Sequence, residues 1–246
     1  MTGISPVEIL AFGAHPDDAE LGCGGTLAAL ARRGYRFGIC DLTRGEAGTR
    51  GTPETRAAEA RRAAEILGAT FRVALDLGDG NLRTDRAAEL DVVRVIRHAR
   101  PRIVFVSWET DRHPDHSRAS RLVTEASWYA GLRALESEAP PHRPQQVLYY
   151  PSSFVAAPSF LVDVTAVYET KLEAIRAYQS QFHDPASPTP ETYVSTKGFL
   201  DGFGSRAQAF GRIANVPYAE GFLTRLPPRL DDPVLAFEGY EPGFSK

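Results

Sequence analysis

The chain has 246 residues, of which 43% are hydrophobic, and its formal net charge at pH 7 is only −3. This length suits one large α/β domain or one and a half small ones, and the weak charge leaves no electrostatic footprint for nucleic acid or anionic lipid. Two cysteines exclude a disulfide framework, no apolar run approaches the roughly 20 residues of a membrane helix, and no secretory signal is evident, so we expect a soluble cytoplasmic protein.

Short apolar runs alternate with amphipathic helical patterns through the first half of the chain. The apolar runs predict strands at residues 9–13, 37–42, 71–77 and 103–107. Apolar residues at helical spacing predict helices at 21–33, 53–67, 87–99 and 117–132. Pro53 and Gly68 bracket the second helix in the positions that favour its start and its end. This alternation predicts an α/β fold, with a Rossmann-like, mostly parallel sheet and helices on both faces.

The second half of the chain has less regular patterns. They predict strands at 147–150 and 160–164 and helices at 166–182 and 197–211, with a Pro-rich loop at 183–190. From Pro227 onward the chain is Pro-rich and acidic, which is typical of an arm over the domain or over a neighbour. We therefore expect one domain at 1–226, with its Rossmann-like core at about 7–150, and a C-terminal arm at 227–246.

The sequence His-Pro-Asp-Asp at 15–18 follows the first predicted strand. An Asp that caps the next helix, as Asp18 could, is common and stabilises a helix by about 1 kcal/mol. Capping explains one carboxylate, but not a second carboxylate beside it together with the imidazole of His15. Adjacent like charges in one turn repel each other unless a cation lies between them, so this motif favours a metal site.

Gly22, Gly24 and Gly25 raise the alternative of a dinucleotide-binding loop. Such a loop needs its first glycine directly after the strand, so that phosphate reaches the helix N-terminus. Here that position holds an imidazole and two carboxylates, which would repel a pyrophosphate. The glycines are better explained by close packing of a helix on the sheet, and Cys23 by a small buried thiol.

The sequence His-Pro-Asp-His at 113–116, preceded by Arg112, follows the fourth predicted strand. Ligands of parallel sheets bind beyond the carboxyl ends of the strands, so we expect both motifs in one cleft. A catalytic zinc takes three protein ligands and keeps a position for water. His116 can reach a metal ion, and Asp115 can hold the imidazole of His113, which as a cation would stabilise an oxyanion. The two motifs together predict metal-assisted hydrolysis.

These motifs resemble those of the PIG-L/LmbE-like family of zinc-dependent N-acetylglucosaminyl deacetylases. Residues 14–18 with the Gly-Cys-Gly-Gly sequence at 22–25 are similar to the family's first motif, and residues 113–116 to its second. Within the family, the stretches 39–43, 63–68, 111–113 and 218–222 most resemble the deacetylases of bacillithiol biosynthesis. The resemblance covers most of residues 9–226 and excludes the arm.

The resemblance implies a role for each residue of the motifs. The implied zinc ligands are His15, Asp18 and His116, and the implied general base is Asp17. His113 would be the acid and oxyanion stabiliser, oriented by Asp115. Iron(II) suits the same donor atoms nearly as well as zinc.

Four further positions match the family's substrate site. Arg56 and Arg112 are implied to bind the substrate, Glu46 to line the sugar pocket, and Tyr193 to stabilise the tetrahedral intermediate. From the residues alone, Arg56 is more typical of a solvated helix surface, and Tyr193 is equally typical of a lid residue or of simple packing.

The implied reaction removes the acetyl group from an N-acetylglucosamine conjugate, and the implied substrate is N-acetylglucosaminyl malate. The alternatives are another N-acetylglucosamine conjugate, a chitooligosaccharide, or a metal-binding or nucleotide-binding module without catalysis. We expect no nucleic-acid or membrane partner. The resemblance also implies a homo-oligomer, with a hexamer as the assembly to test.

Overall fold

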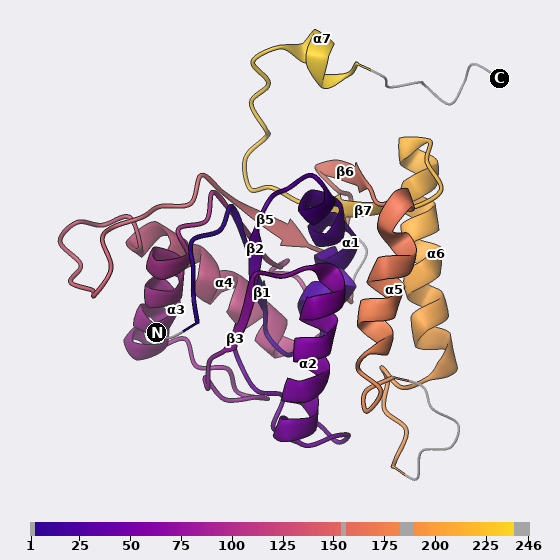
Figure 1. Cartoon of the computed structure of the whole chain (residues 1–246), viewed down its shortest axis with the longest axis horizontal. Coiled ribbons are helices and arrows are strands. Elements are labelled where there is room, and N and C mark those ends of the chain that lie inside the picture. Colours follow the sequence, from indigo (N-terminus) through magenta and orange to yellow (C-terminus); the bar gives the residue numbers. More distant parts are fainter. Residues whose placement is uncertain (1–2, 154–155, 183–188, 239–246) are drawn as a thin grey trace.

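The computed structural model describes residues 3–153, 156–182 and 189–238 (Figure 1). Its centre is a five-stranded parallel sheet in the order β3-β2-β1-β4-β5, which confirms the predicted Rossmann-like fold. The strands are β1 (Ile9–Gly13), β2 (Phe37–Asp41), β3 (Phe71–Ala74), β4 (Ile103–Ser107) and β5 (Gln146–Tyr150). β1 lies in the middle, because Ile9 is in register with Phe37 of β2 and with Ile103 of β4.

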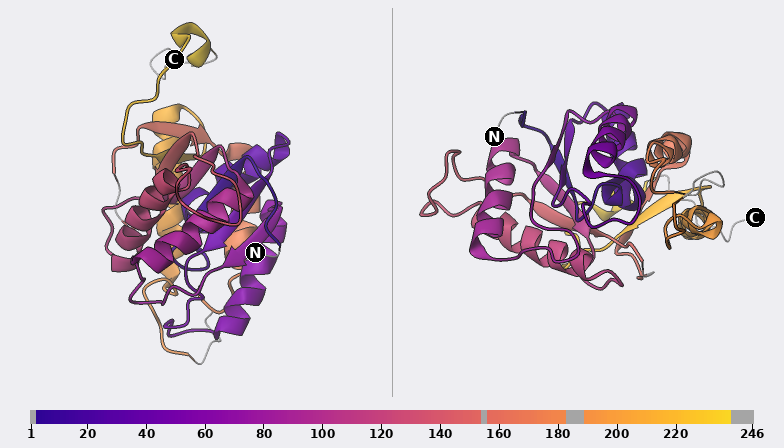
Figure 2. Two further views of the ribbon diagram at one scale, coloured as in Figure 1. Left: turned by 90° about the vertical axis from the view of Figure 1, so that its left-hand side faces the viewer. Right: turned by 90° about the horizontal axis from the view of Figure 1, so that it is seen from below.

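Side chains of β1 alternate between two hydrophobic cores, one on each face of the sheet. Leu10 and Phe12 pack in the core beneath α3 (Arg86–Ala99) and α4 (Pro114–Tyr129). Ile9 and Ala11 pack in the core beneath α1 (Asp18–Arg32), α2 (Pro53–Leu67) and α5 (Tyr168–Arg176). Figure 2 shows the resulting three layers. A sheet covered on both faces explains why its strands read as continuous apolar runs.

Local signals in the sequence determine where the helices begin and end. α2 has the predicted bounds, because the Thr52 hydroxyl accepts the Thr55 N–H at its start and Gly68 has a φ of 83° at its end. α4 begins at Pro114, three residues before the predicted start, because Nδ1 of His113 accepts the Asp115 N–H at 3.2 Å. The second motif therefore forms the first turn of α4.

The second half departs from the prediction in several elements. The predicted helix at 166–182 is instead a short 3-10 turn, Thr165–Val167, followed by α5, which ends at Arg176. Residues 219–222, which were not predicted to be a strand, form β7 (Ala219–Phe222), antiparallel to β6 (Phe160–Asp163). β7 also lies against α6 (Lys197–Ala214), which is three residues longer than predicted.

Gly22 and Gly25 lie inside α1 rather than in the turn after β1, which removes the basis for a dinucleotide-binding loop. A Cβ on Gly22 would lie 2.2 Å from the ring of Tyr150, and a Cβ on Gly25 would lie 2.9 Å from Val164. The carboxylate of Glu220 accepts the N–H groups of Gly25 and Thr26, so β7 meets the helix backbone directly. Close packing of α1 is therefore what these glycines permit.

Residues 227–238 extend away from the sheet and the longer helices and contain the short α7 (Pro233–Ala236) (Figure 1). Residues 239–246 of the predicted arm, and 183–188 of the predicted Pro-rich loop, lie outside the described residues. No helix in the described ranges is long and apolar enough to cross a membrane.

Candidate active site

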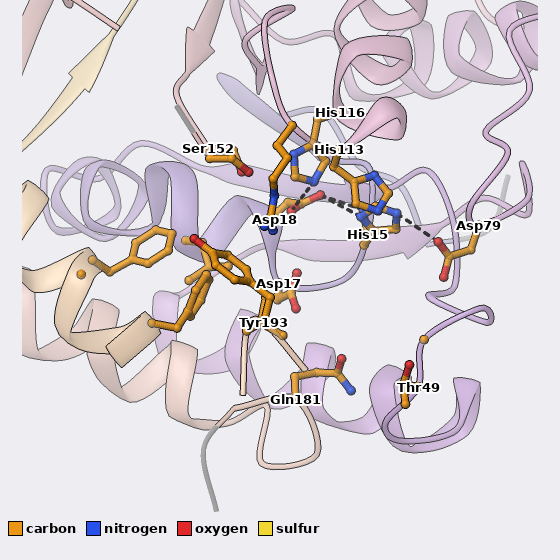
Figure 3. A pocket seen from close by; sticks show the side chains of 18 of the residues that line it. His15, Asp17, Asp18, Thr49, Asp79, His113, His116, Ser152, Gln181 and Tyr193 are labelled. Carbon is orange, nitrogen blue, oxygen red and sulfur yellow. Dashed lines mark hydrogen bonds and ion pairs between the residues drawn. The ribbon is translucent and has the colours of Figure 1, made fainter. Parts of the chain in front are cut away.

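Both motifs lie at the carboxyl end of the sheet, on either side of the point where the strand order reverses. The first follows β1, and the second follows the loop after β4 as the N-cap and first turn of α4; β1 and β4 are neighbours in the sheet. They meet at a cavity of about 540 Å³. In Figure 3 the imidazoles of His15, His113 and His116 gather together, while Gln181 and Thr49 lie across the cavity from them. This is where ligands of doubly wound sheets bind.

The first motif forms a strained turn at the start of α1. Asp17 has a φ of 116°, a conformation that non-glycine residues rarely adopt. The turn is held because Asp18 Oδ2 accepts the backbone N–H of His15 at 2.9 Å. Strain of this kind costs about 1–3 kcal/mol and is concentrated at functional sites, where surrounding contacts maintain it. The turn directs the carboxylates of Asp17 and Asp18 into the same cavity.

Two imidazoles converge on the carboxylate of Asp18. His116 Nε2 lies 3.2 Å from Asp18 Oδ1, and His15 Nδ1 lies 3.5 Å from Asp18 Oδ2. The opposite nitrogen of each ring faces another carboxylate: Asp111 Oδ1 is 2.9 Å from His116 Nδ1, and Asp79 Oδ1 is 3.1 Å from His15 Nε2. A carboxylate behind the imidazole is the usual support of a metal-ligating histidine.

The charges of this cluster fit a cation. Burial alone would lower the pKa of His116. The carboxylates of Asp18 and Asp111 outweigh this effect and raise that pKa to about 10. Burial likewise opposes ionisation of Asp18, yet the charge on His116 and the hydrogen bonds from both imidazoles hold its pKa well below the usual value. The carboxylates thus attract positive charge, which a divalent ion would supply in place of two protons. Two nitrogens and one oxygen form a donor set that suits zinc.

Two further groups of three side chains bring potential metal-ligating atoms close together. His15, His113 and His116 form one group whose ligand atoms lie within 4.8 Å of one another, and His15, Asp79 and Asp115 form another. His15 belongs to both groups, so the metal-ligating chemistry of the site is concentrated around it.

Asp17 has the properties of a general base. Burial raises the pKa of its carboxyl to about 7, against the opposing charge of Arg56. A base whose pKa lies near the working pH is the most effective one. Arg56, expected to bind substrate, is itself buried and donates to the backbone oxygens of Pro16 at 2.7 Å and Gly45 at 3.2 Å. Its other contact is Asp17 Oδ2 at 3.5 Å, so Arg56 lines the cavity and also supports the Asp17 turn.

We expected the carboxylate of Asp115 to hold the imidazole of His113, and this expectation is wrong in one respect. The backbone N–H of Asp115, not its carboxylate, meets the imidazole of His113. The carboxylate accepts the N–H groups of Gly80 and Leu82 and the guanidinium of Arg118, because α4 begins early and turns that side chain toward the 79–82 loop. With Nδ1 as an acceptor, a neutral His113 carries its proton on Nε2.

The protonation state of His113 also differs from the expectation, because the sequence suggested a cationic imidazole. Burial, followed by the neighbouring charges of His15 and His116, lowers the pKa of His113. The neutral imidazole is therefore favoured, and it is a hydrogen-bond donor through Nε2.

Tyr193 and Arg112 line the cavity together, whereas Glu46 is not one of its lining residues. The guanidinium carbon of Arg112 lies 3.8 Å from the centre of the Tyr193 ring, a cation–π contact. The carboxylate of Glu46 accepts the N–H of Arg44 at 3.0 Å and of Asp79 at 2.8 Å. Glu46 thus joins the loops after β2 and β3 and supports the position of Asp79.

Sequence reasoning missed three residues of the site, Asp79, Asp111 and Arg206. Asp111 precedes the second motif by two residues and could have been found as a carboxylate in the same loop. Asp79 lies in a Gly-Asp-Gly turn, which reads as ordinary loop chemistry. Arg206 lies in α6 and lines the cavity from a distant part of the chain. Nothing in its local sequence indicates this position.

Fold and site together define an α/β protein with a His–Asp–His cluster at the carboxyl ends of its strands. A family model described as GlcNAc-PI de-N-acetylase, PIG-L, matches residues 10–127. The diacetylchitobiose deacetylase of Thermococcus kodakarensis is 34% identical over 229 residues, which are 87% of this chain and 81% of that protein. The chain therefore belongs to the PIG-L family of de-N-acetylases.

Two solved structures are similar over nearly the whole chain. The conserved protein TT1542 from Thermus thermophilus is 41% identical, with a TM-score of 0.83 over 91% of this chain and 97% of that one. The N,N'-diacetylchitobiose deacetylase from Pyrococcus horikoshii, solved with an inhibitor, is 26% identical, with a TM-score of 0.77 over 89% of this chain and 83% of that one.

Proposed function

We propose that the protein removes the acetyl group from an N-acetylglucosamine conjugate by metal-assisted hydrolysis. The single observation that carries the proposal is the convergence of His15, Asp18 and His116, with Asp17 beside them in the same cavity. Membership of a de-N-acetylase family supports the same reaction. Zinc is the proposed ion, held by those three residues, and iron(II) is the alternative to test by metal analysis.

Each group of the site has a definite part in the proposed reaction. A bound divalent ion would supply Lewis acidity toward the acetamide carbonyl and the attacking water. Asp17 lies beside these ligands in the cavity and takes the proton of that water. His113, whose Nδ1 accepts a backbone N–H, offers Nε2–H to the oxyanion as a hydrogen-bond donor, and the departing amine receives the proton that Asp17 took from the water. Arg56 holds the Asp17 turn, and Asp79 and Asp111 hold the two imidazoles.

The proposed substrate is N-acetylglucosaminyl malate, an amino sugar whose aglycone carries two carboxylates. The cavity volume of about 540 Å³ is sufficient for a sugar and its aglycone. Arg112 lines the cavity and makes no ion pair in the described parts of the chain, so it supports recognition of an acid. The alternative is a neutral chitooligosaccharide, which the names of two similar proteins favour.

A substrate panel tests the proposal. Purified protein loaded with zinc is assayed for free amine on N-acetylglucosaminyl malate, N,N'-diacetylchitobiose and free N-acetylglucosamine. We expect the highest kcat/KM with the malate conjugate. A higher value with diacetylchitobiose would replace the substrate but keep the reaction. No amine from any of the three would overturn the reaction itself.

The proposal also includes a cytoplasmic homo-oligomer. Light scattering of the purified protein measures the assembly: a mass near six times that of the chain supports a hexamer, and the mass of one chain excludes any oligomer.

A further inference from the structure

Three arginines line the cavity: Arg56 contacts Asp17, whereas Arg112 and Arg206 make no ion pair among the described residues. The described carboxylates of the lining, Asp17, Asp18 and Asp79, all belong to the end with the imidazoles. Arg112 and Arg206 line the part formed with α6 and the segment before it. A substrate that extends from the imidazoles toward α6 therefore meets the guanidinium groups of Arg112 and Arg206.

Arg206 is a cation without an acidic partner among the described residues. Its guanidinium donates to the backbone oxygen of Ser152 and lies over the Phe203 ring, with the guanidinium carbon 4.4 Å from the ring centre. Glu220, the carboxylate with the largest electrostatic effect on it, already binds Lys171 and two backbone amides of α1. Burial accordingly lowers the pKa of Arg206, whose guanidinium remains charged at neutral pH.

Arg112 and Arg206 are connected through the loop after β5. Asp111, next to Arg112, accepts the Ser153 N–H at 2.8 Å and the Ser153 hydroxyl at 3.1 Å. Arg206 binds the oxygen of the preceding residue, Ser152. The loop after β5 thus fixes the guanidinium of Arg206 through Ser152 and the residue before Arg112 through Ser153, while the guanidinium of Arg112 lies against the Tyr193 ring. Unpaired cations held in this way are typical of an anion-binding subsite.

We propose that Arg206, with Arg112, forms a subsite that binds a carboxylate on the aglycone of the substrate and so determines specificity for acidic conjugates. Arg206 is a specificity residue in this account, while Asp17 and the metal ligands carry out the chemistry. The inference rests on the proposed function for the identity of the sugar, but it concerns binding, which is measurable without hydrolysis.

The experiment is an equilibrium titration of the zinc-loaded protein with glucosaminyl malate, the deacetylated product, and with its dimethyl ester, which has the same skeleton without the charges. The test variant is Arg206→Gln. The matched control is Arg212→Gln, an exposed arginine of the same helix that does not line the cavity. Arg206→Lys separates charge from the planar geometry of the guanidinium.

We expect wild type and Arg212→Gln to bind the diacid about tenfold or more tightly than the diester, since charge-assisted hydrogen bonds are worth about that factor. Arg206→Gln should lose most of this ratio while its affinity for the diester changes less than about threefold, and Arg206→Lys should lie between them. An equal loss for both ligands means a structural role through Ser152 and overturns the subsite. So does an unchanged ratio in Arg206→Gln, or a wild type that binds diacid and diester equally.

The same variants separate this inference from the proposed function. Absence of amine release from every substrate, with diacid preference intact and dependent on Arg206, would refute the deacetylation and keep the subsite. Amine release that Arg206→Gln reduces equally for the malate conjugate and for diacetylchitobiose would keep the deacetylation and refute the subsite.

Discussion

Asp111 supports the imidazole of His116, and its substitution tests whether that imidazole binds the metal ion. Asp111 Oδ1 accepts His116 Nδ1–H at 2.9 Å and the His113 N–H at 2.9 Å, and Oδ2 accepts the Ser153 N–H at 2.8 Å. Asp111→Asn keeps an acceptor for His116 but removes the charge. A charge-assisted hydrogen bond exceeds a neutral one by about 1.4 kcal/mol, which is a factor of about ten in affinity.

We therefore expect Asp111→Asn to weaken zinc binding by about 10- to 100-fold, the range found for groups that orient metal ligands. The assay is competition with a chelator of known affinity. Ser153→Ala is the control, because it removes only the 3.1 Å contact of the Ser153 hydroxyl with Asp111 and should change zinc affinity by less than about threefold. A folded Asp111→Asn variant that binds zinc as tightly as wild type would refute the assignment of His116 as a ligand.

Three further predictions concern the chemistry and the packing. His113→Ala should reduce kcat by about 100- to 1000-fold and retain the metal, and loss of the metal on analysis would contradict its role. In the metal-free protein, burial raises the pKa of Asp17 to about 7, above the value of about 3.9 in the unfolded chain. Between these two pKa values the native state binds a proton that the unfolded chain has lost, so the free energy of unfolding falls as pH rises from about 4 to 7. Asp17→Asn should abolish most turnover, keep the metal, and in metal-free form gain thermal stability over wild type between about pH 5 and pH 8; a difference independent of pH would refute the shifted pKa. Gly22→Ala should destabilise by about 1–3 kcal/mol because its Cβ meets the Tyr150 ring at 2.2 Å, whereas Gly24→Ala, whose nearest contact is 3.6 Å, should be neutral or stabilising. Equal unfolding midpoints for the two variants would show that α1 can shift.

The parts of the fold with strong local signals could be predicted from the sequence. Thr52 and Gly68 mark both ends of α2, and the apolar runs of β1 and β4 reflect burial on both faces. β7 could not be predicted, because its sequence contains Glu220 and Gly221. Glu220 is buried only because Lys171 and the α1 backbone, both remote in sequence, satisfy its carboxylate.

In the candidate site, too, some features follow from local sequence signals and others from contacts between distant parts of the chain. His15 and His116 could be predicted to meet, because parallel strands bring their carboxyl ends to one edge of the sheet. The direction of the Asp115 carboxylate depends on the 79–82 loop, whose path no local pattern indicates. Arg206 enters the cavity only through the packing of α6, an arrangement that long-range contacts determine.

We propose that a metal ion held by His15, Asp18 and His116 is required for deacetylation. The most direct measurement is acetate release from N-acetylglucosaminyl malate by protein stripped with a chelator, and then titrated with zinc while bound metal is quantified. We expect no release from the stripped protein and full recovery at one zinc per chain. Full activity of the metal-free protein, or zinc that binds and restores nothing for any acetylated amino sugar, would contradict it.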